Sequence, residues 1–295
     1  MKKAIYVAAV VLFGVNVSYA GETALDSLRA AVSPSVFSGL VMPGTDKGYV
    51  TGNGFSAGAA AKPVEWITIN GGKFTMGTDS GEQGFEDAKP IREVAIKTFD
   101  MSKTAVTVEQ YAECVFKGHC TEPKTGDYCN WGVAGRKLHP VNCVSWDQAY
   151  EYARFKGGRL PSESEWEYAA TSGGKNQKYP WGNEEPTCDK AVMFGNGGYG
   201  CGKNSTMPVC SKPAGNTAQG LCDMAGNVLQ WVQDRYQDSY EGAPFDGSAF
   251  YGPSLSRVLR GGCFVSKGAR VLRDERRSRN AAEYHYGDVG FRLAR

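Results

Sequence analysis

Apolar residues recur with strand-like or helix-like spacing in only a few short stretches of this chain. Residues 64–69 (VEWITI) and 93–97 (EVAIK) alternate apolar and polar side chains, which predicts strands with one buried face. Thr107, Ser145 and Ser162 are each followed three residues later by Gln or Glu, and this spacing predicts a capping box at the start of a helix. Toward the C-terminus, Gly, Asn, Asp and Pro interrupt the pattern so often that we expect long irregular segments.

The first 20 residues have the pattern of a secretory leader. Two lysines precede an apolar run, Ala4–Val17, and Ser18 and Ala20 stand where signal peptidase requires small residues. The run is shorter than the roughly 20 residues of a membrane-spanning helix. We therefore predict a signal peptide at residues 1–20, export to the periplasm or the exterior, and no membrane span after its removal.

Composition divides the remaining chain into two parts. Residues 21–63 are rich in Gly and Ala and predict an extension or linker, whereas aromatic residues are frequent throughout 64–295, which predicts one compact domain. The 295 residues include 38 Gly and 13 Pro, a composition typical of a loop-rich fold. The 33 Lys and Arg nearly balance the 31 Asp and Glu, so the charge excludes nucleic acid as the expected partner.

Nine cysteines in an exported chain indicate disulfide bonds. Four pairs and one remaining thiol are the simplest count, and pairing between neighbours along the chain is our hypothesis, because sequence alone leaves the connectivity open. Cys263 is the expected free thiol, either buried and inert or reactive. No CxxC spacing occurs and there are only three histidines, so a zinc cluster is not favoured. The cysteines expected to pair are Cys114, Cys120, Cys129, Cys143, Cys188, Cys201, Cys210 and Cys222.

Motifs of familiar catalytic machinery are absent from the sequence. It contains no Walker loop, and its one GxSxG string, GFSAG at 54–58, lies in the Gly- and Ala-rich segment, where no apolar strand pattern precedes it as a nucleophile elbow requires. The basic run from Arg270 to Arg279 is interleaved with Asp274 and Glu275, which predicts ion pairs within the fold rather than an anion site.

Several longer segments follow one another in an order and spacing found in one known family. They are WITINGGKFTMGTDS, KPIREVAIKTFDMSKTAVTVEQYAECV, HPVNCVSWDQAYEYARFKGGRLPSESEWEYAA, YPWGNEEP, GLCDMAGNVLQWVQD and RVLRGGCF with YGDVGFRLAR. Together they resemble the formylglycine-generating enzyme or sulfatase-modifying-factor family, and the resemblance covers residues 64–295. It implies an α+β fold related to C-type lectins: irregular and loop-rich, with short helices and small sheets, and often with bound calcium.

The resemblance also shows what this chain lacks. In the family, two cysteines of the segment after the Gly-Gly motif hold Cu(I), and the enzyme uses molecular oxygen to oxidise a cysteine of a client sulfatase. When RVLRGGCFVSKGARVLR is laid on that motif, the two positions fall on Ser266 and Val271. A hydroxyl is a hard, weak ligand for Cu(I), and an isopropyl group is no ligand. The resemblance therefore implies a member without the copper-binding cysteine pair, and we expect no copper.

Calcium is a separate expectation. The family wraps one ion in a loop of the form Asn/Asp-x-x-Gly-Asn-x-x-Glu. The matching positions here are Asp223, the carbonyls of Gly226 and Val228, and Gln230, which offers an amide oxygen where a carboxylate is usual. The resemblance thus implies a structural calcium site weakened by the loss of one charge. The alternative is that Asp223 and Asn227 only cap a turn.

Two classes of function remain open. The first, which we favour, is a non-catalytic binding or regulatory accessory protein of the cell envelope, for example of a kinase or secretion system, with an envelope or secreted protein, or a glycan, as partner. The second is an oxygen-dependent oxidase of the formylglycine-generating type, or a non-haem iron enzyme, with an altered active site. Cys263 and His285 are the candidate catalytic residues of that alternative. Iron usually needs two histidines and a carboxylate, so His139 and His285 would have to converge.

Overall fold

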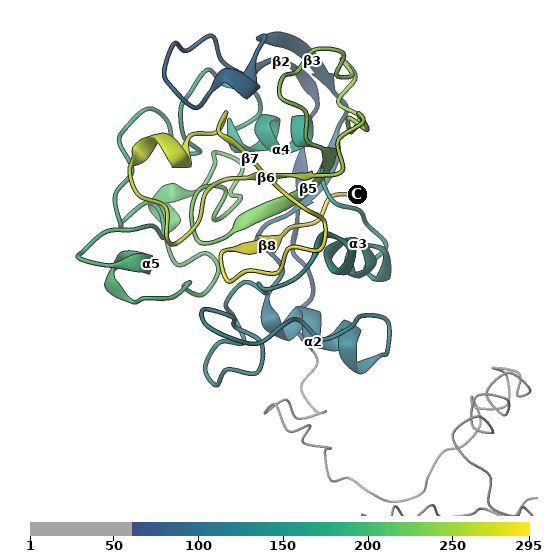
Figure 1. The fold of residues 1–295 in the computed structure, drawn as a ribbon, viewed down its shortest axis with the longest axis vertical. Helices are drawn as coiled ribbons and strands as arrows, with labels where there is room; N and C mark the ends of the chain where they lie inside the picture. Colours follow the sequence, from purple (N-terminus) through teal and green to yellow (C-terminus); the bar gives the residue numbers. More distant parts are fainter. Residues whose placement is uncertain (1–60) are drawn as a thin grey trace, which may run out of the picture. The chain divides into compact units, whose positions relative to one another are not determined.

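Residues 61–295 are described by the structure, which is a computed structural model; the predicted leader and the predicted linker as far as residue 60 lie outside the described residues. The strands are β1 (Trp66–Ile69), β2 (Gly72–Met76), β3 (Arg92–Ile96), β4 (Phe99–Ser102), β5 (Leu229–Arg235), β6 (Arg257–Arg260), β7 (Arg277–Asn280) and β8 (Val289–Phe291). The helices are α2 (Val108–Phe116), α3 (Trp146–Phe155), α4 (Glu163–Ala170) and α5 (Tyr199–Gly202), with single 3-10 turns η2 (Glu86–Ala88), η3 (Pro213–Gly215) and η4 (Ala269–Leu272). These short elements are joined by long irregular segments, so the domain has the irregular α+β fold that was expected (Figure 1).

The described strands form small sheets. β1 pairs with β4 and β2 pairs with β3, both antiparallel, and the predicted strands at 64–69 and 93–97 correspond to β1 and β3. The largest sheet has the order β7-β6-β5-β8, in which β5 is antiparallel to β6 and parallel to β8. The β5–β8 pairing aligns Leu229 with Val289. The Arg292 guanidinium, one residue after β8, donates to the Cys222 carbonyl oxygen at 2.6 Å, so the segment before β5 lies close to the segment that ends the chain.

The three predicted helices begin at the predicted capping residues. Thr107, Ser145 and Ser162 are the N-caps of α2, α3 and α4. In each case the hydroxyl accepts a hydrogen bond from the backbone N–H three residues later, and the Gln or Glu at that position accepts one from the N–H of the cap. Two N–H groups that a helix start would otherwise leave without partners are thus satisfied.

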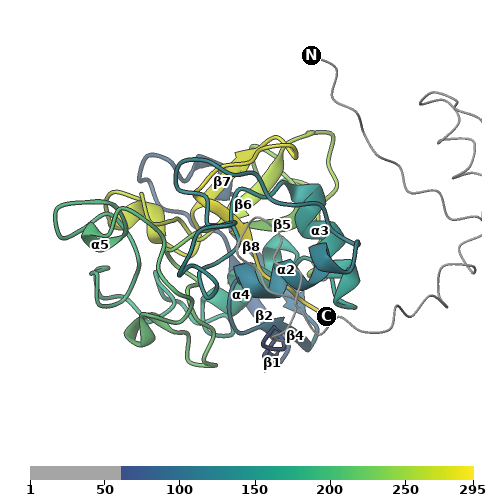
Figure 2. The same cartoon turned by 90° about the horizontal axis from the view of Figure 1, so that it is seen from below.

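The core lies around α4 and around the pair α2–α3. All residues of α4 are buried, and the helix contacts β2, β3, β5 and β6, between which it lies in Figure 1. The indole N–H of Trp166 on α4 donates to Gln230 Oε1 at 2.8 Å. Between α2 and α3, the rings of Tyr111 and Tyr152 stack with centroids 5.3 Å apart. Figure 2 shows α5 at the end of the domain away from α2 and α3.

Buried arginines tie α4 to the large sheet. Arg277 on β7 donates to both carboxylate oxygens of Glu163, at 2.7 and 2.9 Å. Arg260 on β6 is paired with Glu167. The four side chains are at most 4% exposed. The ion pairs predicted for the basic run are confirmed at Arg277, and the pairs formed by Arg273 and Arg279 agree.

The disulfide bonds join neighbours along the chain, and Cys263 is free and buried. The pairs are Cys114–Cys120, Cys129–Cys143, Cys188–Cys201 and Cys210–Cys222. The hypothesis of neighbour pairing is therefore confirmed. Because disulfides persist in oxidising compartments, they fit an extracellular or periplasmic protein. Among residues 61–295, none of the helices has the length and apolar character that crossing a bilayer requires.

Candidate functional site

The segment after β6 turns back on itself through two glycines. Gly261 and Gly262 have φ values of 97° and 66°, in the left-handed region that side chains disfavour. A Cβ at Gly262 would come within 3.2 Å of Ser266 Oγ and 2.8 Å of the Val271 carbonyl oxygen. The turn therefore brings positions 266 and 271 close to one point, as a site with two ligands requires.

The side chains at this point do not fit Cu(I). Ser266 Oγ accepts a hydrogen bond from the Cys263 N–H at 3.0 Å. Val271 packs against an apolar cluster that includes Tyr179 and Leu272. A hydroxyl that caps a turn and an aliphatic group in an apolar cluster supply no soft ligand.

The free thiol next to this point is buried and protonated. Cys263 is 3% exposed, and its Sγ lies 3.5 Å from Ser266 Oγ and 3.9 Å from Asp288 Oδ2. Burial and the negative charge of Asp288 raise the pKa of the Cys263 thiol to about 11. Burial also raises the pKa of Asp288. Because thiolate is the form that attacks and binds metals, Cys263 at neutral pH has the properties of a packing residue.

The histidines proposed for the enzyme alternative have other partners. His285 Nδ1 lies 3.3 Å from the Cys143 carbonyl oxygen, and His139 Nδ1 lies 2.8 Å from Thr206 Oγ1. Burial, followed by the charge of Arg136, lowers the pKa of His139 to about 4. Within residues 61–295, no three or more His, Cys, Asp or Glu side chains converge in a way that could hold a metal ion.

The predicted calcium residues lie in a loop held by hydrogen bonds. Asp223 Oδ2 accepts from the Cys210 N–H at 2.8 Å, and burial raises the pKa of Asp223. The amide oxygen of Gln230 accepts from the Trp166 indole at 2.8 Å and from the Arg292 guanidinium at 2.7 Å. Its amide nitrogen donates to the Asp223 carbonyl oxygen at 2.8 Å. Calcium is held by free oxygen lone pairs, and in this arrangement the Gln230 amide oxygen is already engaged by two donors, one of them a guanidinium.

The other residues of this loop support its role as a turn. Asp223 and Asn227 have φ values of 52° and 64°. The N–H of Gly226 donates to the Gly261 carbonyl oxygen at 2.8 Å, and Val228 is 1% exposed. The loop at 223–228 therefore packs against the segment that carries Cys263. Binding of calcium stays a prediction, which an experiment described in the Discussion tests.

Aromatic side chains gather beside Ser266. The N–H of Phe194 donates to the Ser266 carbonyl oxygen at 3.0 Å. The ring of Tyr199 lies 5.8 Å from that of Phe194 and 6.4 Å from that of Phe264, centroid to centroid. The Lys267 ammonium lies 4.7 Å from the Phe194 centroid, within the range of a cation–π contact.

Two exposed tyrosines extend this cluster to the surface. Tyr128 is 43% exposed, and its ring lies 5.6 Å from that of Phe264. Tyr286 is 57% exposed and stacks on Tyr284 at 4.1 Å. A Cβ at Gly287 would lie 2.5 Å from the Tyr128 Cβ, so the segment that carries Tyr286 abuts Tyr128. We call Tyr128, Phe194, Tyr199, Phe264, Lys267 and Tyr286 the aromatic surface.

The aromatic surface has no signature in the sequence that predicts it. Its rings come from positions 128, 194, 199, 264 and 286, which only the fold brings together. The available signal was an aromatic residue in each of several Gly-rich turns, such as FGNGGYG at 194–200 and YHYG at 284–287.

The chain matches the family model described as the sulfatase-modifying factor enzyme 1-like domain over residues 55–295, and it therefore belongs to that family. It is similar to the formylglycine-generating enzyme of Streptomyces coelicolor, with 30% identity over 80% of this chain and 92% of the enzyme. The family includes such enzymes and also inactive paralogues.

Two other similarities cover different shares of the matched chains. The serine/threonine-protein kinase Pkn1 of Chlamydia trachomatis is 35% identical over 79% of this chain, which spans only 38% of the kinase. The solved structure of PvdO from Pseudomonas aeruginosa superposes with a TM-score of 0.68 and 29% identity, and covers 85% of this chain and 99% of PvdO. The superposition supports the same fold for this chain.

Proposed function

We propose that this chain is an exported, non-catalytic binding module that acts as a regulatory or accessory protein of the cell envelope. The observation that carries the proposal is the chemistry at the two positions where the family holds copper. Ser266 and Val271 offer a turn-capping hydroxyl and a packed aliphatic group, and neither replaces a thiolate. The nearby thiol of Cys263 is buried, and its raised pKa of about 11 keeps it protonated.

The aromatic surface is the proposed contact with the partner. Tyrosine rings offer a large contact area at a small cost in side-chain entropy, and they are enriched where proteins bind each other. Tyr128 and Tyr286 are about half exposed, and Tyr128 packs on the ring of Phe264, which is 1% exposed and therefore held in place. Lys267 at the edge favours a partner that presents an acidic group next to an apolar one.

The similarity to part of a protein kinase supports the proposed accessory role. The region that matches this chain forms part of a longer chain named a serine/threonine-protein kinase in Chlamydia trachomatis. Such an arrangement supports an accessory role beside a signalling protein. The alternative, an oxidase of the formylglycine-generating type, is supported by the similarity to the Streptomyces coelicolor enzyme.

A photo-crosslinking amino acid placed at Tyr286 tests the proposal in cells that make the protein. The same amino acid at Phe116, which is 69% exposed on α2, is the control. We expect one defined crosslinked partner from position 286 and none from position 116. With that partner purified, Tyr286→Ala and Tyr128→Ala should each weaken binding about tenfold or more, as loss of a hot-spot tyrosine does. Identical products at both positions, or unchanged affinity of both tyrosine variants, would contradict the proposal.

A further inference from the structure

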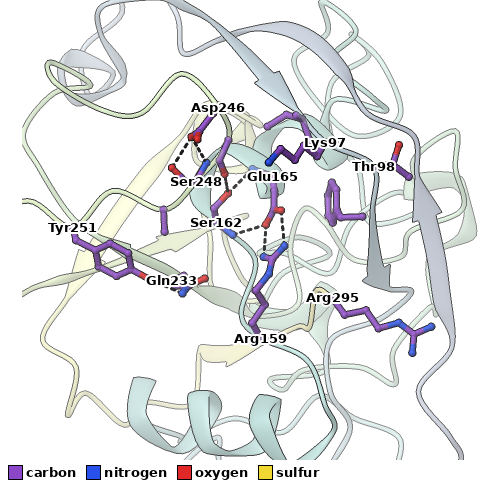
Figure 3. Close-up of a pocket in the computed structure, with 14 residues that line it drawn as sticks. Lys97, Thr98, Arg159, Ser162, Glu165, Gln233, Asp246, Ser248, Tyr251 and Arg295 are labelled. Carbon is purple, nitrogen blue, oxygen red and sulfur yellow. Dashed lines mark hydrogen bonds and ion pairs between the residues drawn. The ribbon is translucent and has the colours of Figure 1, made fainter.

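A concave site lies where the turn between β3 and β4, the start of α4 and the segment after β5 meet (Figure 3). Its cavity of about 610 Å³ falls within the range of small-molecule pockets. None of its lining residues belongs to the aromatic surface or to the segment from Gly261 to Val271. The site therefore stands apart from the proposed partner contact.

One wall of this pocket is rigid. Arg159 donates to both oxygens of Glu165, at 2.6 and 2.7 Å, and one of these oxygens also accepts from the Ser162 N–H at 2.9 Å. The Ser162 hydroxyl donates to the Gly247 carbonyl oxygen at 2.6 Å, which ties the start of α4 to the opposite segment. A frame fixed in this way loses little entropy when a ligand binds.

Other polar groups of the pocket are left with unused bonding capacity. Both hydrogen bonds from Ser248 go to Oδ1 of Asp246, at 3.1 and 2.6 Å. Gln233 Nε2 donates to the Tyr251 hydroxyl oxygen at 2.6 Å. In the part of the chain from 61 to 295, no hydrogen bond engages the Lys97 ammonium, Asp246 Oδ2, Gln233 Oε1 or the Tyr251 hydroxyl hydrogen. Figure 3 shows these side chains around the same hollow.

The charges of the pocket are balanced. Arg159 and Arg295 are ion-paired with Glu165 and Asp100, and the charge of the remaining cation, Lys97, is matched by the Asp246 carboxylate in the same lining. A small anion therefore gains little net attraction. The ligand that suits such a site is uncharged and rich in hydrogen-bonding groups.

We propose that this pocket binds an uncharged sugar residue. Neighbouring hydroxyls of a sugar both donate and accept, which suits the Lys97 ammonium as donor and Asp246 Oδ2 and Gln233 Oε1 as acceptors. Tyr251 is 57% exposed, and its hydrogen bond with Gln233 holds the ring in place. A fixed aromatic ring gives the C–H face of a sugar an apolar surface to lie on.

Saturation-transfer NMR and titration calorimetry on the purified protein test this assignment. The probes are the neutral trisaccharides chitotriose, cellotriose, maltotriose and mannotriose, with sialyllactose as an anionic comparison. We expect at least one neutral trisaccharide to bind. Tyr251→Ala should weaken that binding about tenfold or more, and Asp246→Asn about fivefold.

A matched control separates the pocket from its surroundings. Leu255 is 82% exposed and does not line the pocket, so Leu255→Ala should leave the affinity unchanged. The exposed positions of Tyr251 and Asp246 allow both variants to fold, which circular dichroism verifies. Absence of binding by all the neutral trisaccharides, equal or tighter binding of sialyllactose, or unchanged affinity in both variants would overturn the proposal. None of these results bears on partner binding at the aromatic surface.

Discussion

Replacing Arg277 by methionine should destabilise the domain strongly. The substitution removes a guanidinium that is 1% exposed and binds both oxygens of Glu163, at 2.7 and 2.9 Å. It also removes donors to the Asp87 and Gln237 carbonyl oxygens, at 2.6 and 2.9 Å. Glu163, which is 4% exposed, then keeps its charge without its main partner.

The size of the destabilisation depends on the contacts that Glu163 keeps after the substitution. Removing one partner of a buried ion pair costs about 3–5 kcal/mol. Arg260 remains 3.5 Å from Glu163 Oε1, so we expect the lower end, about 3 kcal/mol. For a domain of this size each kcal/mol lowers the melting temperature by about 2–4 °C, which gives a decrease of about 6–12 °C.

Thermal unfolding followed by circular dichroism with the disulfides intact measures this decrease. Lys73→Met is the control, because the Lys73–Glu93 pair is 2.8 Å long but its side chains are 69% and 64% exposed, so no measurable shift is expected. Adding Glu163→Gln to Arg277→Met should recover part of the loss, since the uncompensated charge disappears. A decrease below about 3 °C for Arg277→Met, or no recovery in the double variant, would refute the reasoning.

Three further predictions concern the candidate site. In the folded protein the pKa of His139 is lowered to about 4 from the ordinary 6.5, so the unfolded chain binds the extra proton, and stability is lost as the pH falls from about 6.5 to about 4. In urea unfolding, the unfolding free energy of the His139→Gln variant should therefore depend less on pH in that range. An unchanged slope would contradict this. Cys263 should react with iodoacetamide only after unfolding, because its thiol is 3% exposed with a pKa of about 11. Mass spectrometry of the protein with intact disulfides measures this labelling. Rapid labelling of the native protein would argue against a protonated, buried thiol. Calcium at millimolar concentration should raise the melting temperature of the Gln230→Glu variant more than that of the natural chain, because a carboxylate restores the missing charge. A large rise in the melting temperature of the natural chain with calcium, reversed by chelator, would show that its loop binds the ion without that charge.

Local signals predicted the helices and the disulfides well. Each capping box needs only residues three positions apart, so Thr107, Ser145 and Ser162 identify their helices without knowledge of the rest of the chain. Neighbour pairing of the cysteines succeeded because the two members of each pair are only 6 to 14 positions apart in the sequence.

Local sequence patterns do not predict features that depend on contacts between distant segments. The sequence motifs implied a domain around residues 64–295, but the partner of Arg277 lies on α4, more than a hundred positions earlier. The sugar pocket likewise combines Lys97, Gln233 and Tyr251 from separate parts of the chain. Nothing in the residues next to each of these positions signals that they meet.

The central claim is that this domain keeps the fold of an oxidase family without its copper chemistry. The most direct test offers the purified protein one equivalent of Cu(I) without oxygen, removes loosely bound metal by gel filtration, and then measures copper content and oxygen uptake with a cysteine-containing peptide. Because Ser266 and Val271 supply no soft ligand and Cys263 is buried, we predict substoichiometric copper and oxygen uptake equal to that of a protein-free blank. One copper ion retained per chain, together with peptide-dependent oxygen uptake, would contradict the claim.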